Sequence, residues 1–132
     1  MMRLLLKKIF IVITATYSVL CAGQVVPLQT PLEAARYARI STSSEISGYL
    51  HALAGRYPTL ARVELAGNSV QNRPIEVIRF SAPRRDHSVK RLTVMIAGSQ
   101  HGAAEPAGGE AMLMIARELA DGYLRPLLEE MD

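Results

Sequence analysis

Apolar residues in this chain recur with the spacing of helices in two segments. Residues 43–56 place Ile46, Leu50 and Leu53 three and four positions apart, which predicts a helix with one buried face. Hydroxyl side chains just before this segment can cap its first turn. A second helical spacing covers residues 109–120, and residues 121–122 (Asp-Gly) are expected to end that helix.

Three other segments have the character of strands. Residues 60–65 alternate weakly, and residues 74–80 fit a second strand with apolar Ile75, Val77 and Phe80. We therefore expect an antiparallel hairpin joined by a turn within residues 66–73. Residues 92–97 are almost continuously apolar. This pattern predicts a strand that is buried on both faces, as in the centre of an α/β sheet.

The order of helix, hairpin, buried strand and helix predicts the α/β fold class. A central strand of this hydrophobicity needs neighbours on both sides, and the chain supplies few other strands. We therefore interpret the sequence as the N-terminal part of a larger domain. A small three-stranded sheet that folds alone is the alternative.

The first 23 residues have the pattern of a secretory signal peptide. Basic residues lie within the first eight positions, residues 9–20 are apolar, and the small residues Ala22 and Gly23 offer a cleavage site. The apolar run is short for a membrane span, although an uncleaved anchor is the alternative. We then expect a linker or arm at residues 24–36 and the folded domain at residues 37–132.

Cleavage of this segment would change the charge and the redox chemistry of the protein. The whole chain has 15 basic and 12 acidic residues, and three of the basic ones lie in the predicted signal peptide. The mature chain would be neutral, which gives no reason to expect a nucleic-acid partner or stable membrane insertion. It would also lose Cys21, the single cysteine. We expect an exported protein, periplasmic or secreted, without disulfides.

The candidate chemistry lies immediately after the predicted buried strand. His101 follows a short turn of small residues, and Glu105 with Pro106 comes where the next helix should begin. Imidazole nitrogen and carboxylate oxygen are ligands that zinc favours, and the end of a sheet strand is a common ligand-binding position. A loop histidine and a carboxylate that stabilises the helix N-terminus would give the same pattern without a metal.

At these residues the chain resembles the M14 family of zinc carboxypeptidases. Residues 45–57 are similar to the family's opening helix, residues 67–75 to its "G-x-S … G-R-P-I" hairpin, and residues 97–110 to its first zinc-ligand segment. The resemblance implies that His101 and Glu105 bind Zn²⁺. It also implies a mixed eight-stranded sheet with helices on both faces, and hydrolysis of peptides, including peptidoglycan peptides, by metal-activated water.

The chain departs from the family pattern in two ways. His101 and Glu105 are separated by three residues, whereas the family's usual motif is H-x-x-E. Either the loop bulges to keep Glu105 at the metal, or Ala104 occupies the ligand position. The family's third zinc ligand, substrate-binding residues and catalytic Glu would all follow Asp132, so we expect an incomplete, inactive chain. A non-catalytic, exported peptide-binding remnant and a zinc deacylase of small acyl-amino acids are the alternatives.

Overall fold

The computed structural model describes residues 26–83 and 90–132, so the predicted signal peptide lies outside the described residues. Helices and strands follow one another as α2 (Pro31–Ala34), α3 (Ser43–Arg56), β1 (Ala61–Asn68), β2 (Pro74–Phe80), η1 (Gly102–Ala104), α4 (Pro106–Asp121) and η2 (Arg125–Glu129). The two η elements are short 3-10 helices. Across the described residues, no helix is both long and apolar enough to cross a membrane.

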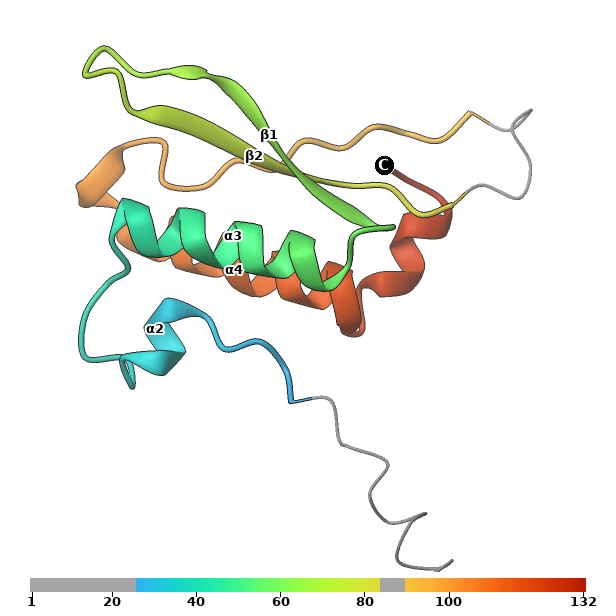
Figure 1. The fold of residues 1–132 in the computed structure, drawn as a ribbon, viewed down its shortest axis with the longest axis horizontal. Helices are drawn as coiled ribbons and strands as arrows, with labels where there is room; N and C mark the ends of the chain where they lie inside the picture. The colour runs from blue at the N-terminus through green and yellow to red at the C-terminus, as the bar shows by residue number, and fades with distance from the viewer. Residues whose placement is uncertain (1–25, 84–89) are drawn as a thin grey trace, which may run out of the picture.

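The elements form a layered α/β arrangement (Figure 1). The β1–β2 hairpin covers one side of α3 and α4, which run next to each other, and α2 lies on the opposite side of these helices. The core between the layers contains Tyr49, Leu50, Leu53, Leu60, Ala61, Phe80, Leu113, Ala116, Ala120 and Leu128. Burial of these apolar side chains is the main favourable contribution to folding.

The first helix and the hairpin agree with the predictions made from local sequence. The bounds of α3 match the predicted residues 43–56, and its N-cap Thr42 forms a capping box with Glu45. The β1 and β2 strands pair antiparallel from Ala61↔Phe80 to Asn68↔Pro74. Strand β1 is longer than the predicted 60–65, and its register shifts between Leu65 and Gly67.

The prediction of a buried strand at residues 92–97 is wrong for the described structure. This segment forms no strand, and its one pairing is a parallel bridge between Leu92 and Met131. Met95 is 85% exposed and Ile96 is 56% exposed. A strand requires hydrogen-bonded neighbours and a covering layer, and among the described residues only the backbone of residues 131–132 pairs with the segment.

Helix α2 lies within residues 24–36, the range predicted as a linker or arm. Its N-cap Thr30 is completely buried and forms a capping box with Glu33. The Glu33 carboxylate accepts two hydrogen bonds from Arg117 of α4, at 2.6 and 3.0 Å. This part of the range is therefore attached to the helical layer.

Candidate metal centre

His101 and Glu105 lie on either side of one short turn. His101 immediately precedes η1, and Glu105 follows η1 and is the N-cap residue of α4. Pro106 occupies the first turn of α4, as predicted, where its missing N–H removes no helical hydrogen bond. The turn therefore brings both predicted ligands to the N-terminal end of α4.

Both side chains are available for a ligand. His101 and Glu105 are exposed, and neither side chain makes a hydrogen bond or ion pair with the residues at 26–83 and 90–132. Their donor atoms are of the kinds that zinc accepts. However, the described part of the chain contains no group of three His, Cys, Asp or Glu side chains that could hold a metal ion. The imidazole and carboxylate of these two candidate ligands are therefore donors of the kind that fit zinc.

The three residues between His101 and Glu105 form a hydrogen-bonded turn. The Gly102 N–H donates to the Ser99 carbonyl at 2.9 Å, and the Glu105 N–H donates to the Gly102 carbonyl at 3.1 Å. Gly102 has a φ of +61°, a left-handed conformation that glycine adopts without steric conflict. The three intervening residues thus form a compact 3-10 turn.

Glu110, which we did not predict as important, anchors the first turns of α4. Its carboxylate is buried and accepts hydrogen bonds from the Ser41 backbone N–H at 2.5 Å and from the Ser41 hydroxyl at 2.9 Å. Ser41 lies just before the N-cap of α3. The acidic residue immediately before the apolar run of residues 111–116 is the sequence signal that could have identified this contact.

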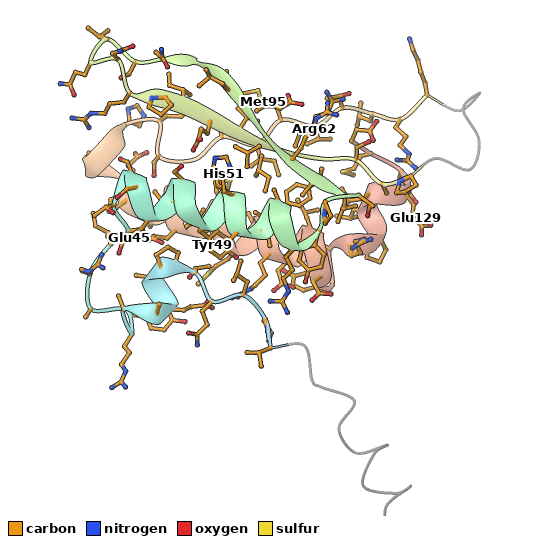
Figure 2. All side chains as sticks on the ribbon, in the orientation of Figure 1. Glu45, Tyr49, His51, Arg62, Met95 and Glu129 are labelled. Atoms are coloured by element: carbon orange, nitrogen blue, oxygen red, sulfur yellow. The ribbon has the colours of Figure 1, made fainter. Side chains whose placement is uncertain are left out.

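A second described histidine has a different environment. His51 points from α3 toward the hairpin (Figure 2), and its Nε2 lies 2.9 Å from a carboxylate oxygen of Glu76 on β2. Hydrogen bonds from Ser47 and then His51 lower the pKa of the Glu76 carboxyl. His51 therefore contacts the hairpin through Glu76 and is not one of the candidate metal ligands.

An apolar groove lies apart from the His101–Glu105 turn. It has a volume of about 210 Å³ and lies between β2, the extended segment 92–97, α4 and η2. Its lining includes Ile78, Phe80, Val94, Ile96, Ile115 and Leu127. Neither candidate ligand lines this groove, so it is a structural feature separate from the candidate metal centre.

The sequence model of the Peptidase_M14 family, described as zinc carboxypeptidase, matches residues 46–131. This chain belongs to the zinc carboxypeptidase family. The matched span includes His101, Glu105 and the groove residues named above. The chain is also 28% identical, over 90 residues, to Carboxypeptidase E of Caenorhabditis elegans. That alignment covers 68% of this chain and 19% of the relative, so the chain spans about a fifth of the relative's length. No solved structure matches.

Membership of the zinc carboxypeptidase family confirms the resemblance inferred from residues 45–57, 67–75 and 97–110. The mixed helices and antiparallel hairpin agree with part of a carboxypeptidase fold. The described residues contain one two-stranded sheet, so the structure does not confirm the eight-stranded sheet of which the chain was expected to be the N-terminal part.

Proposed function

We propose that this protein is part of an exported zinc carboxypeptidase, with peptides as substrate and His101 and Glu105 as two of the zinc ligands. One observation carries the proposal. Within the span that matches the family, both residues flank one turn at the start of α4, with exposed side chains that make no hydrogen bond to the described residues.

In this proposal the chain's own residues bind and orient the metal. His101 would supply an imidazole nitrogen and Glu105 a carboxylate oxygen, and the η1 turn would hold them together. Zinc bound in such a site lowers the pKa of its water and polarises a peptide carbonyl. The buried contact between Glu110 and Ser41 would keep the start of α4, and with it Glu105, fixed against α3.

We also propose that residues 37–132 are the N-terminal part of a mixed eight-stranded sheet domain with helices on both faces. The Asp132 N–H donates to the Leu92 carbonyl, and the Val94 N–H donates to the Asp132 carbonyl, both at 2.9 Å. This is the hydrogen-bond pattern with which a parallel strand pair begins. In the larger domain, residues 92–97 would be an inner strand.

We further propose that the 132-residue chain alone does not hydrolyse peptides. The described residues bring no third ligand to His101 and Glu105, and no general base is assigned. Residues elsewhere in a longer protein would supply both. Export would follow from the basic and apolar pattern of residues 1–23.

A zinc titration by calorimetry tests the ligand assignment. We expect stoichiometric binding by the protein, and its loss in His101→Ala and in Glu105→Ala. The matched control is His51→Ala, which removes an exposed histidine bonded to Glu76 and should leave zinc binding unchanged. Equal zinc affinity in the protein and in both ligand variants would contradict the assignment, and so would absence of binding.

Deletion of Ala104 distinguishes the two interpretations of the long spacing. If the η1 turn holds Glu105 at the metal, the deletion should weaken zinc binding, because it removes a residue of the hydrogen-bonded turn. If the natural chain binds no zinc and the deletion creates binding, the site is damaged by the extra residue. The protein would then be a non-catalytic remnant of a peptidase, for which peptide binding without hydrolysis is the expected activity.

A further inference from the structure

Ser99 connects the two ends of the candidate metal-binding loop. Its hydroxyl donates a hydrogen bond to the Glu105 carbonyl at 2.9 Å and accepts one from the Gly109 N–H at 2.7 Å. Its own carbonyl accepts the Gly102 N–H at 2.9 Å. One residue therefore fastens the start of η1, the N-cap of α4 and the first turn of α4 together.

The loop and α4 pack backbone against backbone at this point. A Cβ added to Gly98 would lie 2.5 Å from the Gly108 carbonyl oxygen, and one added to Gly108 would lie 2.8 Å from the Ser99 nitrogen. A Cβ at Gly109 would lie 2.9 Å from the Ser99 hydroxyl oxygen. These separations are shorter than ordinary van der Waals contact, so the glycines permit the close approach that the Ser99 hydrogen bonds require.

The backbone of Ser99 adopts a conformation that favours glycine, although the residue is a serine. Ser99 has a φ of +55°, in the left-handed region where a non-glycine residue is strained. Glycine would adopt this conformation more easily, but it would leave the Gly109 N–H without the hydroxyl acceptor. The hydrogen bond that the serine hydroxyl donates to the Glu105 carbonyl and the one that it accepts from the Gly109 N–H offset this strain.

We propose that Ser99 is a positioning residue for the metal centre: its hydroxyl holds Glu105 and the first turn of α4 in the arrangement that lets Glu105 and His101 bind one zinc ion. This inference rests on the proposed zinc site. Ser99 does not contact the metal in this proposal. It acts through the Glu105 carbonyl, in the way that outer partners orient metal ligands.

Two substitutions separate the hydroxyl from the backbone strain. Ser99→Ala removes the hydroxyl and keeps the strain, whereas Ser99→Gly removes both. We expect each to weaken zinc binding by about 10- to 100-fold, the usual effect of losing an outer partner. If the backbone conformation of residue 99 alone set the zinc affinity, Ser99→Gly would bind zinc with the same affinity as the natural protein. The control is Ser81→Ala, which removes a hydroxyl bonded at 2.8 Å to Asp132, a residue outside the loop.

Amide hydrogen exchange in the metal-free protein gives a readout that does not depend on zinc. We expect Ser99→Ala to accelerate exchange of the Gly109 N–H by at least about tenfold, because its acceptor is lost, while the Leu113 N–H one turn later is unchanged. Unchanged exchange at Gly109 would overturn the inference. The inference would also be overturned if His101→Ala abolished zinc binding while Ser99→Ala left the zinc affinity unchanged. In that case the proposed zinc site would stand without a role for Ser99. Absence of zinc binding in the natural protein would overturn both proposals.

Discussion

Tyr49 on α3 is buried, including its hydroxyl oxygen, which has no hydrogen-bond partner among the residues that the structure describes (Figure 2 labels the residue). Burial raises the pKa of Tyr49 from 10 to about 12. A buried polar group without a partner destabilises the folded state, because it has lost its hydrogen bonds to water.

We expect Tyr49→Phe to raise the free energy of unfolding by about 1 kcal/mol at neutral pH. Because folding raises the pKa, the natural protein should lose stability as the pH rises from 10 toward 12, and the variant should lose less. Denaturant unfolding at pH 7 and pH 11 measures both effects. The control is Tyr57→Phe, which removes a 2.6 Å hydrogen bond to Asp121 and should destabilise the protein. Destabilisation by Tyr49→Phe at pH 7 would show that its hydroxyl has a partner.

At the scale of elements, one hydrogen-bonded cluster joins α2 to α4. Arg117 donates to both carboxylate oxygens of Glu33 and to the Leu28 carbonyl at 3.2 Å. The hydrogen bonds from Arg117 are the largest of the causes that lower the pKa of Glu33. The ionised form is therefore stabilised by folding, and this contribution is present above the ordinary pKa of 4.5.

We expect Arg117→Met to lower the free energy of unfolding by about 1–2 kcal/mol at pH 7 and to release α2 from α4. As the pH falls below 4.5 and through the lowered pKa of Glu33, the natural protein should lose this same contribution, so the two proteins should converge in stability. Urea unfolding at pH 7 and pH 3 checks this. Arg39→Met is the control, because it breaks an exposed pair with Glu45. Equal losses of unfolding free energy in Arg117→Met and Arg39→Met would contradict the proposal that the α2–α4 contact stabilises the fold more than an exposed ion pair.

The elements that could be predicted from sequence are those that local interactions specify. Helix α3 has its own cap and apolar face, and the strands of the hairpin are joined by a short turn, so both agree with their patterns. The segment 92–97 pairs, among the described residues, only with the backbone of residues 131–132, so its hydrophobicity alone did not predict its structure. The same limit applies to the site: spacing indicated His101 and Glu105, whereas the contacts of Ser99 and Glu110 appear only when separate segments meet.

At the scale of the whole molecule, four apolar side chains within residues 92–96 are exposed in the described structure. Val94 and Ile96 line the groove against β2 and α4, while Met95, on the alternate face of the segment, is 85% exposed (Figure 2). An apolar patch exposed in this way on a soluble protein often marks an interaction site. The patch agrees with the proposed position of residues 92–97 inside a larger sheet.

We therefore expect the 132-residue chain to bind an environment-sensitive apolar dye in this groove and to associate as its concentration rises. Ile96→Glu should reduce dye fluorescence several-fold, because a charge in the apolar groove opposes dye binding. Val70→Glu, at an exposed apolar residue in the hairpin turn, is the control and should leave the signal unchanged. Sedimentation at several concentrations would report the association. A longer form of the protein, in which the proposed sheet is complete, should show neither property. Equal dye binding by the chain and by the longer form would mean that residues 92–97 remain exposed in both, and would contradict their assignment as an inner strand.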